Sequence, residues 1–175
     1  SRLGIASIGT GGKGWSDLTG VAASPDVEVI ALCNIDSSAR HLGQAAEKYR
    51  SARQYDDWRK LLDESKDIQG VLVSTPDFMH APISLAAMHL GKHVFCQKPL
   101  THTVYEARQM QTAATKFNLT TQMGNQIQSH SAYRTAVHMV QTGLIGKVKE
   151  VHSWQGGQPV WPRNIPRPQG SDPVP

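Results

Sequence analysis

A short apolar run near the N-terminus breaks into a glycine-rich turn, Gly9–Gly14, which limits the fold more than any other feature. Glycines at this spacing between a strand and a helix are typical of a dinucleotide-binding turn. Gly9 permits the sharp turn out of the strand, Gly11 lets a pyrophosphate approach the backbone, and Gly14 lets the next helix pack closely. Together with Gly12, they leave free N–H groups at the start of that helix facing the phosphates. The alternative is a glycine-rich turn that binds nothing.

Asp36 ends a second apolar run, Val27–Ile35, and lies about 22 positions after the last glycine of the turn. A carboxylate at that distance accepts hydrogen bonds from a ribose 2′-hydroxyl and repels a 2′-phosphate. The sequence therefore predicts NAD as the cofactor, in preference to NADP. Ser37, Ser38 and Arg40 lie close enough to complicate this choice.

Strand-like and helix-like patterns alternate through most of the chain. The predicted strands are residues 3–8, 27–35, 70–75, 93–97 and 119–123, with a short extended piece near residue 55. The predicted helices follow residue 14 and cover residues 37–50, the region of 61–62, 82–90 and 104–117. Repeated strand–helix–strand units imply an α/β fold with a doubly wound parallel sheet and helices on both faces. We predict that this domain covers residues 1–124.

Such a sheet binds ligands at the carboxyl ends of its strands. Five separate segments are expected to meet at this edge: Gly9–Gly14, Asp36, Ser74–Asp77, Gln97–Pro99 and Gly124–Gln126, the last of which contains Asn125. We expect the dinucleotide to lie along them.

Lys98 stands between Gln97 and Pro99, directly after a buried strand. The residue before a proline is pushed out of the helical region, so the backbone of Lys98 is expected to be extended and its side chain to have a fixed direction. From that position a lysine can reach the nicotinamide end of a dinucleotide and exchange a proton with a substrate hydroxyl. The alternative is a solvated lysine at a strand end.

Ser74, Thr75, Pro76 and Asp77 end the preceding strand, and His80 follows. Hydroxyl and backbone groups in this segment can hold the ribose or the pyrophosphate. A compatible alternative is a helix N-cap, in which Asp77 accepts N–H bonds and His80 lies at the surface.

The character of the chain changes after residue 124. Tyr133–Thr142 is predicted to be a helix closed by Gly143, and Val148–Trp154 alternates like a strand with one exposed face. A proline-rich stretch follows. We predict that residues 125–175 are a linker helix, a first strand and the start of an incomplete second α/β domain. An unpaired edge strand favours pairing with another copy, so a homo-oligomer is expected.

Composition excludes several classes of partner. The net charge is +4 and the basic residues form no run, so neither nucleic-acid nor membrane binding is expected. The histidines form no metal-ligand set, and we predict no metal. The only cysteines, Cys33 and Cys96, lie in apolar runs and are expected to be buried thiols. This favours a reducing compartment and a cytoplasmic location, although removal of an N-terminal signal would make a periplasmic one compatible.

These motifs, taken in order, resemble those of the glucose–fructose oxidoreductase and inositol dehydrogenase (Gfo/Idh/MocA) family. The resemblance rests on the glycine turn, Asp36 and the segments Val73–Pro82, Gly91–Leu100 and Thr142–Val151. It implies an N-terminal Rossmann domain, a C-terminal α/β domain, and oxidation or reduction of a hydroxyl-bearing carbon of a sugar, inositol or related polyol with NAD or NADP.

The resemblance also implies roles for individual residues. Gly9, Gly11 and Gly14 match the pyrophosphate loop, and Asp36 matches the acid that binds the adenosine ribose. The second cofactor segment is matched by Ser74, Thr75, Pro76 and His80. Lys98 and Pro99 match a Glu-Lys-Pro signature whose lysine lies beside the reacting carbon, so Lys98 is the expected catalytic residue.

The sequence departs from the family pattern in two respects. Gln97 replaces the signature glutamate, and any charge pairing at that position is lost. The family's catalytic Asp or His lies well inside the second domain, so we expect this chain alone to have little or no turnover. Two alternatives to a dehydrogenase stay open: an NAD-dependent glycoside hydrolase of the same family, which recycles its cofactor, and a dinucleotide-binding module without catalysis.

Overall fold

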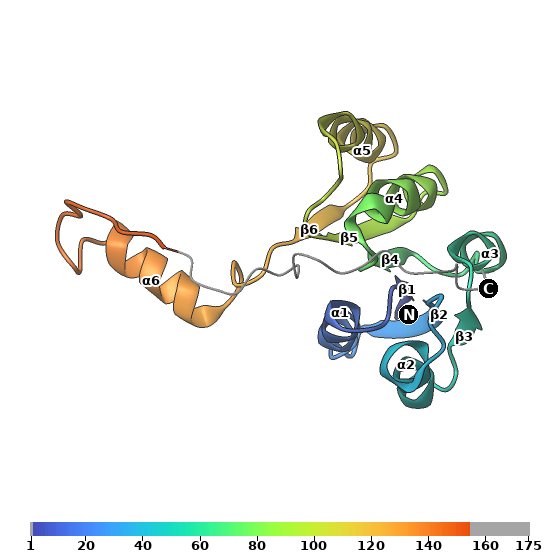
Figure 1. The fold of residues 1–175 in the computed structure, drawn as a ribbon. Helices are drawn as coiled ribbons and strands as arrows, with labels where there is room; N and C mark the ends of the chain where they lie inside the picture. The colour runs from blue at the N-terminus through green and yellow to red at the C-terminus, as the bar shows by residue number, and fades with distance from the viewer. Residues whose placement is uncertain (1, 155–175) are drawn as a thin grey trace, which may run out of the picture. The chain divides into compact units, whose positions relative to one another are not determined.

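The computed structural model describes residues 2–154, and the chain divides into two compact units, Ser1–Asn125 and Gln126–Pro175. The first unit contains a six-stranded sheet in the order β3-β2-β1-β4-β5-β6 (Figure 1). All neighbouring strands in it are parallel. The strand order reverses between β1 and β4, which is where a doubly wound sheet opens a crevice for a ligand. The predicted doubly wound parallel sheet is confirmed.

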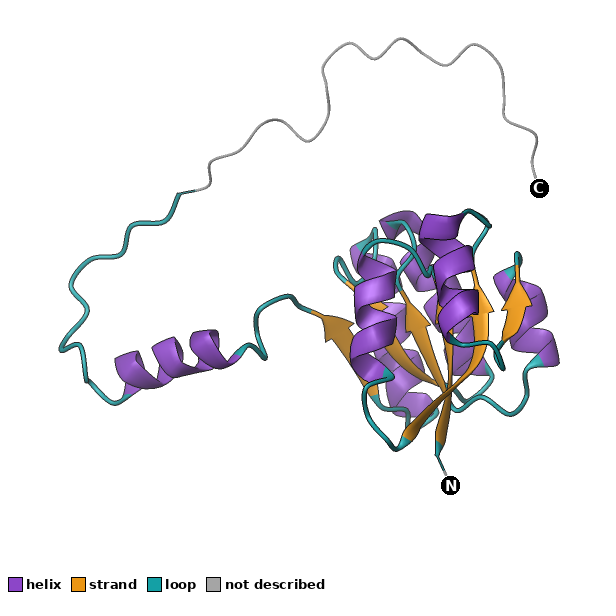
Figure 2. Ribbon diagram, turned by 90° about the horizontal axis from the view of Figure 1, so that it is seen from below, coloured by secondary structure: helices purple, strands orange, loops and turns teal. Residues whose placement is uncertain are grey.

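The elements follow the predicted alternation closely (Figure 2). The strands are β1 (Leu3–Ile8), β2 (Val27–Cys33), β3 (Arg53–Tyr55), β4 (Gly70–Val73), β5 (His93–Gln97) and β6 (Thr121–Gly124). The helices of this unit are α1 (Lys13–Val21), α2 (Gln44–Lys48), α3 (Trp58–Glu64), α4 (His80–His89) and α5 (Val104–Lys116). A π-helical turn, η1 (Ala39–Gly43), precedes α2, and a 3₁₀ turn, η2 (Asp77–Met79), precedes α4.

The two faces of the sheet carry separate hydrophobic clusters. On one face, Leu18 of α1 and Ala45 of α2 pack with side chains of the central strands. On the other, helices α3, α4 and α5 contribute residues such as Leu61, Ile83 and Met110. Both faces of the central strands are therefore covered, which explains why their sequences are almost continuously apolar.

Local signals explain where several helices begin and end. The hydroxyl of Thr103 accepts a hydrogen bond from the Glu106 N–H at 3.2 Å, and the Glu106 carboxylate accepts one from the Thr103 N–H at 2.8 Å. This reciprocal pair is the predicted capping box at the start of α5. Gly91, just after α4, has a φ of +72°, as expected of a glycine that ends a helix.

The segment Ser37–Arg50 is not one regular helix, contrary to our prediction. It opens with the π-helical turn η1, and α2 covers only its second half. Ser38 precedes the turn without capping it by its side chain, because its N–H is bound by Asp36 and its hydroxyl lies 3.0 Å from His41 Nδ1. The contacts of Ser38 with Asp36 and His41 thus take the place of a regular helix start.

The second unit contains helix α6 (Ser131–Gln141) among its described residues. His130 Nδ1 accepts a hydrogen bond from the Ala132 N–H at the start of this helix, and Gly143 follows it with a φ of +74°. Val148–Trp154, predicted to be a strand, is not one. Alternating side chains give a strand only where the backbone pairs with a neighbour, and no other residue within 2–154 pairs with this segment. The proline-rich stretch lies outside the described residues.

Within residues 2–154, no helix is both long enough and apolar enough to cross a bilayer. The same range holds no group of three or more His, Cys, Asp or Glu side chains that could bind a metal ion.

Both cysteines are free and buried, as predicted. Burial, with a smaller effect of the nearby Asp57 and Asp56 charges, raises the pKa of the Cys33 thiol from 9.0 to about 12. Burial raises the pKa of the Cys96 thiol from 9.0 to about 11. Both thiols therefore keep their protons in the folded chain at pH values where an unfolded chain loses them.

We expect these thiols to make stability fall in alkaline solution. Since folded Cys33 and Cys96 titrate above 9.0, their contribution is complete below pH 9 and is lost as the pH rises toward 11 to 12. The loss is at most about 1.4 kcal/mol per pH unit for each thiol. Urea unfolding at pH 8 and pH 10.5 measures it. A double Cys→Ala variant is the control, because lysines and tyrosines also titrate in this range. Equal slopes for the two proteins would contradict the prediction.

Candidate dinucleotide-binding site

The glycine turn is folded tightly against the end of β4. Gly9 has a φ of +85°, and a Cβ atom there would lie 2.4 Å from the carbonyl oxygen of Ser74. A Cβ at Gly14 would lie 2.0 Å from the carbonyl oxygen of Gly9. Neither position can hold a side chain without a backbone shift. The sharp turn predicted at Gly9 and the close packing predicted at Gly14 are therefore present.

Helix α1 begins at the turn without a side-chain cap. Gly12 stands at the N-cap position with a φ of 52° and has no side chain to accept from the N–H groups of the first turn, although the Gly14 N–H donates to the Gly11 carbonyl at 2.9 Å. Its own Cβ position is open, with nothing within 4 Å. An uncapped helix start beside a glycine turn is suited to an anion, because the exposed N–H groups and the helix dipole both favour negative charge.

Asp36 lies just beyond the end of β2, and its carboxylate is already oriented by neighbours. The N–H of Ser38 donates to Asp36 Oδ1 at 2.8 Å, and His41 Nδ1 lies 2.8 Å from Oδ2. Hydrogen bonds from Ser38 are the main reason that the pKa of Asp36 lies below its ordinary value. The carboxylate therefore stays ionised, as an acceptor for ribose hydroxyls must.

His41 lies beside two residues of the candidate site, Gly11 and Asp36, and was not predicted from the sequence. Its ring lies against the glycine turn, since a Cβ at Gly11 would come within 1.9 Å of His41 Cδ2. The same ring contacts Asp36, so His41 joins the two positions expected to hold the pyrophosphate and the ribose. This placement depends on the π-helical turn η1, which the residue pattern does not reveal.

Asp17 of α1 was also missed. It is 8% exposed, and its carboxylate accepts hydrogen bonds from Lys13, from the Ser74 hydroxyl at 3.0 Å and from Gln97 Nε2 at 3.0 Å. Gln97 is 5% exposed, and its Oε1 accepts a hydrogen bond from the Lys98 N–H at 3.0 Å. One buried carboxylate thus links α1 with the ends of β4 and β5.

The end of β4 contributes hydroxyl and carbonyl groups. The Ser74 hydroxyl is used by Asp17, whereas the buried Thr75 hydroxyl has no hydrogen-bond partner within residues 2–154. A buried hydroxyl without a partner is costly, and a ligand that bonds to it removes the cost. Pro76 is exposed and precedes the turn η2. Asp77 accepts a hydrogen bond from the Phe78 N–H at 2.9 Å.

His80 is not at the surface, as the N-cap alternative supposed. It is 1% exposed, with Nδ1 2.6 Å from the carbonyl oxygen of Pro99 and Nε2 2.8 Å from that of Thr75. Residues 76–79 turn back over the sheet end, so the first residue of α4 faces inward. The imidazole therefore connects the segments that follow β4 and β5.

Lys98 follows β5 with an exposed side chain, and its peptide bond to Pro99 is cis. Asn125 follows β6, is exposed, and donates its N–H to the carbonyl of Met123 at 2.9 Å. The strand order places Asp36 and Lys98 on opposite sides of β1. The predicted residues thus form one row along the sheet edge, from β2 through the glycine turn to β4, β5 and β6.

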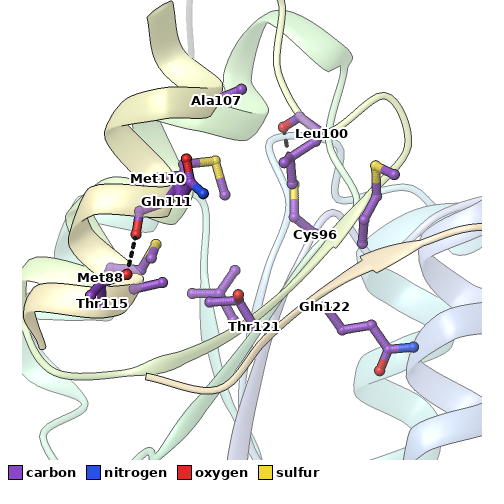
Figure 3. Close-up of a pocket in the computed structure, with 12 residues that line it drawn as sticks. Met88, Cys96, Leu100, Ala107, Met110, Gln111, Thr115, Thr121 and Gln122 are labelled. Atoms are coloured by element: carbon purple, nitrogen blue, oxygen red, sulfur yellow. Dashed lines mark hydrogen bonds between the residues drawn. The ribbon is translucent and has the colours of Figure 1, made fainter. Parts of the chain in front are cut away.

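A cavity of about 260 Å³ is lined by residues of helices α4 and α5 and of strands β5 and β6 (Figure 3). Met88, Cys96, Met110 and Thr121 are among the residues that line it, and none of the predicted cofactor-binding residues does. The candidate site is therefore the open edge of the sheet and not this cavity.

The chain matches known proteins over most of its length. The GFO_IDH_MocA profile, described as an oxidoreductase family with an NAD-binding Rossmann fold, matches residues 3–125. The chain is 32% identical over 126 residues to a levoglucosan dehydrogenase from Pseudarthrobacter phenanthrenivorans, covering 72% of this chain and 31% of that protein. It is 33% identical over 170 residues to a glycosyl hydrolase family 109 protein from Stenotrophomonas maltophilia, covering 90% of this chain and 36% of that protein.

Among solved structures, the chain resembles myo-inositol 2-dehydrogenase from Lactobacillus plantarum, with a TM-score of 0.76 and 26% identity. The match covers 85% of this chain and 43% of that one. The chain spans about a third of the length of the two curated relatives, 31% and 36%.

Proposed function

The chain belongs to the Gfo/Idh/MocA oxidoreductase family, and we propose that it is the cofactor-binding part of an NAD-dependent dehydrogenase. The hydride would pass between NAD and a hydroxyl-bearing carbon of a sugar, inositol or related polyol. The observation that supports this best is the glycine turn, where Gly9 and Gly14 leave no room for a side chain and α1 starts uncapped. Levoglucosan and inositol dehydrogenases among the similar proteins support the substrate class.

The residues present fit a dinucleotide. The turn would hold the pyrophosphate with backbone N–H groups, and Asp36 would accept hydrogen bonds from the adenosine ribose. Thr75 has a buried hydroxyl free for the ligand, at the next strand end on the other side of β1. NAD supplies the hydride chemistry, while the protein supplies placement and electrostatics.

Lys98 would act at the other end of the row. Its N–H is held by Gln97, while its side chain is exposed and so accessible to a substrate hydroxyl. In the proposed reaction the uncharged Lys98 amine would take up the hydroxyl proton, and the O–H bonding pair would become the second bond of the carbonyl. The C–H bonding pair would leave the carbon as hydride and pass to bound NAD, so that atoms and charge balance.

The match to a glycosyl hydrolase family 109 protein over 90% of this chain supports a second candidate, an NAD-dependent glycoside hydrolase. Such an enzyme would keep its cofactor through purification and cleave a glycoside without net formation of NADH. A dehydrogenase would accumulate NADH in proportion to the polyol consumed. A module that only binds dinucleotide would do neither.

The first experiment is a titration of this chain with NAD and NADP by calorimetry and by thermal shift. A ligand that binds only the folded state raises the unfolding temperature with its concentration. We expect saturable binding with NAD preferred. No heat and no shift at millimolar NAD, with a chain that still unfolds cooperatively, would exclude the proposal.

Replacing Asp36 with alanine is expected to weaken NAD binding by about 10- to 100-fold, since hydrogen bonds to a charged group contribute about 1.5–3 kcal/mol. NADP binding should change less, because its 2′-phosphate is no longer repelled. Calorimetry of both ligands measures the ratio. Asp26→Ala, in the exposed turn before β2, is the matched control and should leave both affinities unchanged. An unchanged NAD-to-NADP ratio in Asp36→Ala would contradict the ribose assignment.

A further inference from the structure

A buried carboxylate, that of Asp17, contacts Gln97 next to Lys98, at the proposed nicotinamide end of the site. The side chain of Asp17 is 6% exposed, and Lys13 is the charged side chain that the structure places against it. The Ser74 hydroxyl and Gln97 Nε2 both donate to its Oδ2, each at 3.0 Å. Three donors from α1, β4 and β5 thus satisfy one carboxylate, which is how a buried charge is tolerated.

Gln97 is held from both ends of its amide. Nε2 donates to Asp17, and Oε1 accepts from the N–H of Lys98, so the two ends of the amide cannot be exchanged without losing both bonds. Strand β6 also approaches the Gln97 amide closely, because a Cβ at Gly124 would lie 2.6 Å from Gln97 Nε2. The Gln97 side chain therefore has one position, and that position sets the N–H of Lys98.

We propose that Asp17 is a positioning residue for the nicotinamide end of the site, acting through Gln97 on Lys98, and that the amide at position 97 is matched to it. This inference rests on the proposed function for its ligand. The negative charge is on Asp17 of α1, which does not contact Lys98 directly. The Gln97 amide lies between them and bonds to both. On this proposal, Gln97 stands in place of the family's signature glutamate because its amide can donate to Asp17, which a carboxylate cannot do.

A glutamate at position 97 would bring a second carboxylate to the buried Oδ2 of Asp17. Two carboxylates at about 3 Å cannot both be ionised in a buried place, and the pair takes up a proton. The folded Gln97→Glu variant would then hold a proton that the unfolded chain releases near pH 4 to 5. Its stability relative to wild type should therefore fall as the pH rises from about 4 to 8.

The test uses four proteins: wild type, Gln97→Glu, the exchange variant Asp17→Asn/Gln97→Glu, and Gln109→Glu as a control on the exposed face of α5. The exchange variant restores an amide opposite a carboxylate with the two roles reversed. Urea unfolding from pH 4 to pH 8 gives the stability profile. Calorimetry with NAD and with ADP-ribose, which lacks the nicotinamide, gives the affinities.

Gln97→Glu should lose stability with rising pH, bind NAD about tenfold more weakly and bind ADP-ribose less than threefold more weakly. The exchange variant should recover the wild-type pH profile and NAD affinity within threefold, and Gln109→Glu should match wild type. A Gln97→Glu profile equal to wild type, or no recovery in the exchange variant, would overturn the pairing. Equal losses for NAD and ADP-ribose would overturn the assignment to the nicotinamide end.

These outcomes are separable from failure of the proposed function. If wild type binds neither ligand, the proposed function fails, while the pH profiles still decide whether the two side chains form a matched pair. If wild type binds neither ligand, the role of Asp17 in positioning the nicotinamide end is overturned as well.

Discussion

Replacing Gly9 with alanine is expected to abolish measurable NAD binding and to lower the free energy of unfolding by about 3 kcal/mol. Two costs combine at this position. A φ of +85° is unfavourable for any residue with a Cβ, and the added atom would lie 2.4 Å from the carbonyl oxygen of Ser74. Either the turn or the end of β4 must move, and both are expected to contact the ligand.

Urea unfolding and calorimetry with NAD measure the two effects of Gly9→Ala. The matched control is Gly20→Ala, on the exposed side of α1, where an added Cβ meets nothing within 4 Å. The control should keep its NAD affinity and gain up to about 1 kcal/mol, because alanine is the better helix former. NAD affinity within threefold of wild type in Gly9→Ala would show that the turn does not hold the pyrophosphate.

Replacing Lys98 with methionine is expected to lower turnover by about 10²- to 10⁴-fold, the usual contribution of a positioned acid–base group. NAD affinity should stay within about threefold, because the backbone N–H that binds Gln97 is retained. The measurement needs an active protein that contains this chain, assayed by NADH formation with a polyol substrate. A pH–rate profile of wild type and variant then shows whether a titrating group has been removed.

Lys60→Met, an exposed lysine on α3, is the control for loss of one positive charge and should leave turnover unchanged. Full activity in Lys98→Met would remove Lys98 from the reaction and favour a module that only binds dinucleotide. Glycoside cleavage without net NADH in wild type would favour the hydrolase instead.

Features encoded within a short stretch of sequence were predictable. The strand β5 falls at the predicted residues 93–97, and the capping box at Thr103 forms as predicted. Gly9 makes the sharp turn, and Gly14 shows the close packing, that were expected of them. In each case a few adjacent residues determine the backbone, so that the pattern and the structure agree.

Features that depend on contacts between distant segments were not predictable. Asp17 and Gln97 are 80 positions apart, and nothing in either neighbourhood indicates that their side chains meet. His41 reaches Gly11 only because the chain forms a π-helical turn after β2. His80 was expected at the surface as one alternative, but the preceding 3₁₀ turn directs it inward.

The hydrogen bond between the Ser74 hydroxyl and the Asp17 carboxylate crosses the line along which the sheet divides. It joins the half that contains β1 and α1 to the half that begins with β4, where the strand order reverses. Breaking it while the carboxylate stays buried would leave that carboxylate one donor short, which costs about 1–3 kcal/mol. The bond therefore adds a side-chain link to the backbone pairing of β1 with β4 and helps to hold the two halves together.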